Sequence, residues 1–183
     1  MKGFYRKDTA FSLCGLNCLL CPMHLGGHCP GCGGGPGNQS CAIARCSLDH
    51  GQPEFCWQCR EYPCLRYEGF DDYDSFLPHR GRQRDVAQAQ AVGLEAYLEG
   101  LAEKRALLDA LLAGYNDGRR KTFFLTAVSL LDLPSLRQVM ARLAATPEEA
   151  GPKGRAKTAA ALLQAEADRQ GISLKLAKKP KGR

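Results

Sequence analysis

The chain lacks cysteine over most of its length, and this absence divides the sequence in two. Ten of its 183 residues are cysteines, and all ten lie between Cys14 and Cys64. No apolar run approaches the ~20 residues that a membrane-spanning helix needs. The chain is also too short for a (β/α)8 barrel of about 250 residues. These absences exclude membrane helices and large barrels, and they indicate two parts stabilised by different physics.

Motifs of nucleotide chemistry and hydrolysis are missing as well. The segment GCGGGPG lacks the lysine and the following helix that a phosphate-binding loop needs. No spacing assembles paired carboxylates or a Ser-His-Asp triad. The four histidines form no motif either: His24, His28, His50 and His79. The sequence therefore favours a role outside catalysis, and it identifies no catalytic residue.

The N-terminus has basic residues before an apolar stretch, as secretory signals do. Asp8 interrupts the basic part, Asn17 and three cysteines interrupt the apolar part, and no small-residue cleavage site follows. We therefore expect a soluble, cytoplasmic protein. Closely spaced cysteines in a reducing compartment bind metal more often than they form disulfides. A disulfide-stapled module from an oxidising compartment is the alternative.

Residues 1–70 are rich in glycine, cysteine and proline and show no sustained helical or strand periodicity. Such a segment buries little apolar surface, whereas each ordered residue costs ~1 to 2 kcal/mol of backbone entropy. Bound metal must then supply the missing stability. We expect a cysteine-rich metal-binding module over 1–70 and a polar connector over 71–84.

Helical patterns begin at Asp85. Apolar residues recur at spacings of three and four up to Tyr115. The segment 121–133 is apolar nearly all round and should be central, and Pro134 opens a third helix. A loop should follow over 146–154, and a fourth helix, 157–170, should stop at Gly171.

After Gly171, the alternation in ISLKLAKK predicts a short strand. The expected fold is α+β. It consists of a small metal-stabilised N-terminal module with zinc-knuckle-like turns and a mainly helical part over 85–177 with a C-terminal strand. A frayed basic tail, 178–183, would end the chain.

Two Cys-x2-Cys pairs give the strongest local signal: Cys29 with Cys32, and Cys56 with Cys59. This spacing lets two thiolates converge on one tetrahedral ion, and two such pairs are typical of a zinc-ribbon or treble-clef site. Zinc, as one or two ions, is the cofactor that this pattern favours.

Cys14, Cys18 and Cys21 form a second group with the spacing Cys-x3-Cys-x2-Cys, which suits a metal site or an iron–sulfur cluster. The spacing also matches radical S-adenosylmethionine enzymes, but the long βα array of those enzymes is missing. An iron–sulfur or thiol-dependent redox enzyme is therefore the alternative, with Cys64 as a candidate reactive thiol. All ten cysteines are candidate metal ligands: Cys14, Cys18, Cys21, Cys29, Cys32, Cys41, Cys46, Cys56, Cys59 and Cys64.

Positive charge gathers at the C-terminal end, where residues 151–183 hold nine Lys/Arg against two Asp/Glu. This end could dock on the negatively charged metal module or seek a polyanion. Basic and aromatic residues that could form a nucleic-acid patch are Phe4, Tyr5, Arg6, Lys7, Arg80, Arg82, Arg84, Arg119, Arg120 and Lys121. We expect a protein partner first and nucleic acid as the alternative. No membrane partner is expected, and the oligomeric state cannot be read from the sequence.

The ordered signature CGLNC-x2-C-P, C-P-G-C, C-A-I-A-R-C, C-W-Q-C and Y-P-C, followed by NDGRRKTFFLTAVSLL, resembles domain of unknown function family 3795. Its members open on CGL-x-C-x2-C and close their cysteine module on C-x2-C-x2-[Phe/Tyr]-P-C. The resemblance covers most of the chain, although Leu125 stands where some members carry a further cysteine. It implies that the cysteines form one module, and it implies no activity.

Overall fold

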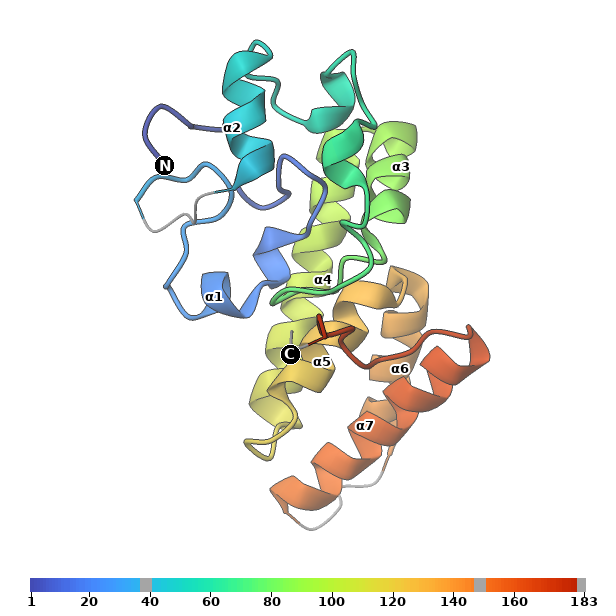
Figure 1. The fold of residues 1–183 in the computed structure, drawn as a ribbon. Helices are drawn as coiled ribbons and strands as arrows, with labels where there is room; N and C mark the ends of the chain where they lie inside the picture. The colour runs from blue at the N-terminus through green and yellow to red at the C-terminus, as the bar shows by residue number, and fades with distance from the viewer. Residues whose placement is uncertain (37–40, 147–150, 181–183) are drawn as a thin grey trace. The chain divides into compact units, whose positions relative to one another are not determined.

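The structure is a computed structural model that describes residues 1–36, 41–146 and 151–180. These residues contain seven α-helices and three short 3-10 helices (Figure 1). The elements are η1 (Cys18–Leu20), α1 (Pro22–Leu25), α2 (Ala42–Asp49), η2 (Cys56–Gln58), η3 (Leu65–Tyr67), α3 (Arg82–Val92), α4 (Leu94–Gly114), α5 (Lys121–Leu130), α6 (Leu133–Ala145) and α7 (Pro152–Arg169). The chain divides into two compact units, Met1–Leu98 with the chain end from Ala177, and Glu99–Leu176.

Four aromatic side chains form one apolar cluster of the first unit. The Phe55 and Trp57 rings stack at 4.2 Å between centroids, and Phe11 lies 4.7 Å from Tyr97. Phe11 has no exposed surface and Phe55 very little. Aromatic rings bury more area per residue than aliphatic side chains. The cluster thus gives a core to a region whose helices are very short.

A buried polar network connects the first cysteine turn to α3 and α4. The Asn17 side chain donates a 2.9 Å hydrogen bond to Asp85 and accepts one of 2.8 Å from the Tyr97 hydroxyl. All three residues are buried. Because each polar group has a partner, the network avoids the cost of an unpaired buried donor or acceptor. It fixes Asn17, and with it the adjacent Cys18.

Residues 71–84 are held by ion pairs. Arg82, whose side chain is 2% exposed, binds Asp71 with both arms at 2.8 and 2.7 Å and stacks over the Tyr67 ring at 4.5 Å. Asp74 accepts hydrogen bonds of 2.7 Å from the main chain of His79 and of Ala177. These carboxylates therefore serve as structural partners of cations and N–H groups.

The second unit is helical and built around α5. All but three residues of this helix are buried, and α7 packs against both α5 and α6. The largest side chains without appreciable exposure are Leu108, Leu111, Phe124, Val128, Leu131, Leu136, Val139 and Leu163. Asp132 caps α6 by accepting a 2.8 Å hydrogen bond from the Ser135 N–H. A buried apolar core and the cap of α6 therefore stabilise this unit.

Three of the helix predictions are confirmed. The apolar segment 121–133 forms α5 over residues 121–130, Pro134 lies in the first turn of α6, and residues 157–169 lie in α7. The pattern from Asp85 to Tyr115 forms two helices instead of one continuous helix, because Gly93 between them has φ +88°. The predicted loop 146–154 and the tail fall partly on 147–150 and 181–183, which lie outside the described residues.

The α+β prediction is wrong. Over residues 1–36, 41–146 and 151–180 the structure is helical and holds no strand, including the expected C-terminal one. A strand needs a partner along its edge, but the segment after Gly171 pairs with a distant part of the chain at one residue. The Asp74 N–H donates to the Ala177 carbonyl at 2.7 Å, and the Ala177 N–H donates to the Asp74 side chain instead of its main chain. Leu174 is buried. The alternation in ISLKLAKK therefore reflects one buried leucine in an extended coil.

Candidate metal centre

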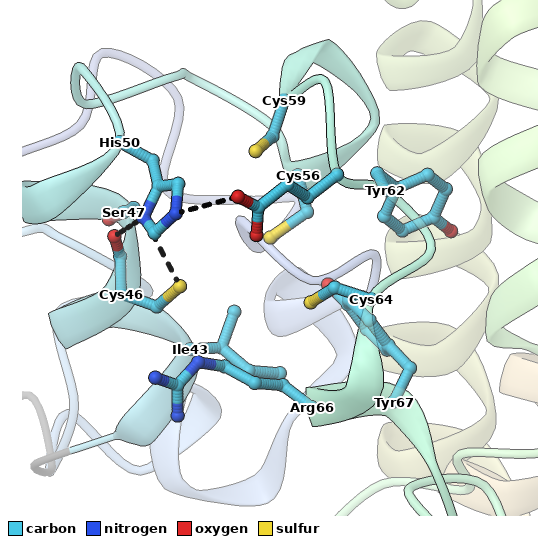
Figure 2. A pocket seen from close by; sticks show the side chains of 11 residues that line it. Ile43, Cys46, Ser47, His50, Cys56, Cys59, Tyr62, Cys64, Arg66 and Tyr67 are labelled. Carbon is cyan, nitrogen blue, oxygen red and sulfur yellow. Dashed lines mark hydrogen bonds and ion pairs between the residues drawn. The ribbon is translucent and has the colours of Figure 1, made fainter.

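Four of the ten cysteines line a single small pocket in the first unit. They are Cys46, Cys56, Cys59 and Cys64, and the cavity between them and their neighbours measures about 30 Å³. Figure 2 shows the four sulfur atoms turned toward the middle of this pocket. A cavity of this size holds about one small body such as a water molecule or an ion. We call this group the pocket cysteines.

Three short elements place the pocket cysteines. Cys46 lies on α2, which also buries Ile43 and Ala44 in a hydrophobic cluster, and Ile43 lines the pocket beside Cys46. Cys56 opens η2 and donates its N–H to the Leu13 carbonyl at 2.9 Å, and the N–H of Cys59 bonds the Cys56 carbonyl at 3.0 Å. Each position is thus fixed by main-chain hydrogen bonds or by apolar packing.

The last pocket cysteine, Cys64, stands immediately before η3. Its carbonyl accepts a 2.9 Å hydrogen bond from the N–H of Tyr67. The Tyr67 ring forms edge contacts with Tyr62 and Phe70 at 5.3 and 5.6 Å. The loop that delivers Cys64 is therefore held on both sides by aromatic contacts.

Cationic groups gather around the Cys46 sulfur. His50 Nδ1 lies 3.5 Å from Cys46 Sγ and 2.8 Å from its carbonyl oxygen, while His50 Nε2 lies 3.4 Å from a Glu61 carboxylate oxygen. The Arg66 guanidinium hydrogen-bonds the same sulfur. Polar side chains from the end of α2 and from the loop around Cys64 thus meet at the Cys46 sulfur.

Burial opposes ionisation of the neighbouring thiol. The pKa of Cys56 is raised to about 11, mainly by burial and also by the nearby Cys64, Cys46 and Cys59 thiols, while the Tyr67 hydroxyl lowers it. The Tyr67 oxygen is itself buried and forms no hydrogen bond of good geometry within the described chain. A divalent cation in the pocket would reverse this balance, because it attracts all four thiolates at once.

The donors of the pocket are of the kind that binds thiophilic metals. Four thiolates are the usual ligand set of a structural zinc site, which closes on the ion as a tetrahedron. Across the described ranges, however, no group of three or more His, Cys, Asp or Glu side chains is arranged so that it could hold a metal ion. Binding would thus require the four sulfurs to draw closer together than they stand.

The other six cysteines lie outside this pocket: Cys14, Cys18, Cys21, Cys29, Cys32 and Cys41. Cys14, Cys32 and Cys41 pack against the hydrophobic cluster that contains Leu13 and Ile43. All ten cysteines are half-buried free thiols. The ten thiols therefore do not share one site: the pocket cysteines form one group, and the cysteines on the hydrophobic cluster lie outside it.

The grouping differs from the two pairs that the sequence suggests. Cys56 and Cys59 share their pocket with Cys46 and Cys64, and the Cys29–Cys32 turn lies elsewhere. Cys41 is the N-cap of α2, and Cys46 follows five residues later on the same helix. At 3.6 residues per turn, five residues rotate a side chain by about 140°. Cys41 and Cys46 therefore face different groups.

Sequence reasoning missed the cations beside the thiols. His50 follows Cys46 by four residues, a spacing that places two side chains on the same face of a helix and could have been noticed. Arg66 is close to Cys64 in sequence but acts on Cys46. Arg6 is 26 residues from Cys32 in sequence and still bonds the Cys32 carbonyl at 3.3 Å. For Arg6 the sequence offers no signal.

Several residues of the expected nucleic-acid patches have other roles in the fold. Phe4 and Arg6 are buried, so residues 4–7 present only Tyr5 and Lys7. The arginines at 80, 82 and 84 form ion pairs with Asp74, Asp71 and Asp85. None of the helices that the structure describes has the length and apolar character to cross a membrane.

Comparison with known proteins adds no relative. No family model, no curated protein and no solved structure matches the chain.

Proposed function

We propose that the first seventy residues form a metal-binding module in which the four pocket cysteines hold one thiophilic ion, with zinc as the favoured metal. The observation that carries this proposal is the convergence of Cys46, Cys56, Cys59 and Cys64, from three separate elements, on one cavity of about 30 Å³. Bound zinc would supply cross-links between α2, η2 and the loop before η3. The role of such a closed site is structural.

The residues around the pocket suit this assignment. Four thiolates and one divalent ion carry a formal charge of about −2. Arg66 and His50 lie beside the Cys46 sulfur, where positive charge would offset this negative charge. The donor set also suits a four-iron cluster with the same formal charge, so the identity of the metal has to come from its chemistry. The resemblance to the cysteine-rich family points in the same direction and adds no activity.

Metal analysis tests the proposal directly. The full chain is purified anaerobically, and metal and acid-labile sulfide per chain are measured together with the visible spectrum. A colourless protein with zinc and no sulfide supports the structural site. Iron with sulfide and a brown colour would move the assignment to an iron–sulfur protein.

Single substitutions test which residues bind the ion. Cys56→Ser and Cys64→Ser should each release one metal ion per chain, because a structural zinc site needs all four ligands. Leu65→Ser is the matched control, since Leu65 neighbours Cys64 but its side chain is 80% exposed. Equal metal content in all three variants and the parent protein would contradict the proposed site.

We extend the proposal from metal binding to the binding of a protein partner. The exposed Leu65 follows Cys64 directly and borders an open hollow of about 540 Å³ that Tyr62, Pro63, Val86 and Arg82 also line. An exposed leucine beside a hollow that mixes apolar and polar walls suits a protein partner. Because the metal would hold the Cys64 loop, partner binding should depend on the metal.

A further inference from the structure

A second group of thiols lies around Cys32, outside the pocket described above. Cys14 lies near Cys32 and Cys41, which add to the effect of burial in raising its pKa, and the pKa of Cys18 is raised by burial and by Cys32, Cys14 and Cys21. Cys14, Cys32 and Cys41 also pack on one hydrophobic cluster, which Cys56 of the pocket touches as well. The four residues Cys14, Cys18, Cys32 and Cys41 come from three separate segments of the chain, so the fold brings them together rather than the sequence.

Main-chain N–H groups lie near three of these four sulfurs. The Leu16 N–H lowers the pKa of Cys14, the Cys32 N–H that of Cys18 and the Leu13 N–H that of Cys32, in each case against a larger rise from burial. The Leu16 N–H itself donates to the Ser12 hydroxyl oxygen at 2.7 Å. The Ser12 hydroxyl lies 3.2 Å from Cys14 Sγ as well. N–H donors aimed at sulfur stabilise thiolates, because a hydrogen bond to the charged form favours that form.

The fourth residue, Cys41, is the N-cap of α2, and its side chain forms no cap hydrogen bond. Burial raises the pKa of Cys14 to about 12 and raises that of Cys18 and Cys32. A metal cation among these sulfurs would oppose this rise, because it attracts the deprotonated form of each thiol.

Arg6 places a buried positive charge beside this group. Its side chain is 1% exposed and bonds three main-chain oxygens, those of Glu54, Phe11 and Cys32, at 2.9 to 3.3 Å. Its Nη2 atom is buried without a hydrogen bond, and its ion pair with Glu54 is 3.5 Å long. The guanidinium also acts on the Cys32 thiol.

The chain is built so that Arg6 can approach this closely. A Cβ atom at Gly33 would lie 2.8 Å from three atoms of Arg6, which is closer than real contacts allow. Glycine at this position therefore lets the Cys32 turn rest on the Arg6 backbone. The Glu54 carboxylate is already occupied, since it accepts hydrogen bonds from the N–H groups of Lys7 and Asp8. A buried cation with an unbonded donor favours a neighbouring anion.

We propose that Cys14, Cys18, Cys32 and Cys41 hold a second thiophilic metal centre and that the buried Arg6 guanidinium compensates the negative charge of its thiolates. This inference rests on the proposed function for the class of metal, but it uses no residue of the pocket. A chain with both centres binds two ions, each through four thiolates. Arg6 is a positioning residue that acts through Cys32.

Differential alkylation of the full chain tests the ligand set. The zinc-loaded and the chelator-treated proteins are labelled briefly, and each cysteine is read by peptide mass spectrometry. Zinc should protect Cys14, Cys18, Cys32 and Cys41, with Cys29 labelled equally in both samples as the internal reference. Protection of Cys29 in place of Cys41, or equal labelling of all four with and without zinc, would overturn the second centre.

Metal counting separates the two proposals. Cys14→Ser should lower the zinc content from two ions per chain to one, as should Cys56→Ser, and the double variant should hold none. If the parent protein binds one ion, and Cys14→Ser keeps this ion while Cys56→Ser loses it, the second centre is excluded and the pocket site stands. If the parent protein binds no metal, both sites are excluded.

The role of Arg6 is tested by competition with a chelator. Arg6→Gln should raise the dissociation constant of one of the two ions by about 10- to 100-fold, the usual cost of losing a partner of a ligand. Arg6→Lys, which keeps the charge, should recover part of this loss. Arg60→Gln is the control, because Arg60 is exposed. Both dissociation constants unchanged in Arg6→Gln, with the helical circular dichroism intact, would overturn the role of Arg6.

Discussion

The two units of the chain reach a stable core by different means. The unit Glu99–Leu176 buries leucine, valine and phenylalanine from four helices, and polar groups are few among its largest buried side chains. The cysteine-rich unit buries two arginines, Arg6 and Arg82, at 8% and 2% exposure. Buried cations are costly unless anions accompany them. The comparison teaches that the first unit needs charge compensation, which carboxylates supply in part and thiolates can complete.

The largest expected effect comes from removing metal. A chelator added to the full chain should abolish the slow amide exchange of residues 10–70 while the exchange of α5 and α7 stays as it was. Structural zinc sites contribute about 10 to 16 kcal/mol of binding free energy, which becomes folding free energy. Hydrogen-exchange mass spectrometry at peptide resolution measures both regions in one sample. If the chelator left the amide exchange of residues 10–70 unchanged, metal would not be the source of stability that distinguishes the first unit from the second.

The reverse experiment perturbs the helical unit. Phe124→Ala should destabilise it by about 3 to 5 kcal/mol, because Phe124 is fully buried and its removal leaves a cavity. Phe123→Ala is the matched control, since the neighbouring ring is only half-buried and should cost less. Denaturant unfolding followed by circular dichroism measures the difference. Loss of bound metal in Phe124→Ala but not in Phe123→Ala would show that the two units are not independent.

A smaller effect concerns pH. The Arg169 guanidinium, with Ser135 and Gln170, lowers the pKa of Glu166 to about 2. A carboxyl group with a depressed pKa stabilises the fold above its unfolded value near 4.3 and loses this contribution as the pH falls toward 2. Because Arg169 is mostly exposed, the contribution is about 1 kcal/mol or less.

The melting temperatures of the parent protein and of Glu166→Gln should therefore differ most near pH 5 and converge toward pH 3. Metal release in acid affects both proteins equally, so their difference isolates the carboxylate. Glu99→Gln, at an exposed position of α4, serves as the control. A difference that stays constant over this range would contradict the assignment.

The helical unit could be predicted well because its signals are local. Apolar periodicity, Pro134 in a first turn and the glycine after the last helix each act within a few residues. The predicted strand failed because pairing depends on a distant partner. Leu174 and its alternating neighbours look the same in sequence whether or not such a partner exists.

The grouping of the cysteines could not be predicted, because it depends on contacts between distant residues. The sequence predicts which residues are candidate ligands, since short Cys spacings are local, but it does not predict which of them meet. Cys56 and Cys59 lie with Cys46 and Cys64 because α2 and the η2 turn both pack on the Leu13 region. Arg6 reaches Cys32 through tertiary packing alone. Such contacts leave no periodic trace in the sequence.

The position of Cys41 and Cys46 on one short helix restricts the changes in length that the chain tolerates. Inserting or deleting one residue between them turns one sulfur by about 100° around the α2 axis relative to the other. Either thiol would then point away from its own group while the apolar side of α2 loses its register with Leu13. The segment from Cys41 to Cys46 is thus a fixed-length spacer, and substitutions there are far better tolerated than insertions.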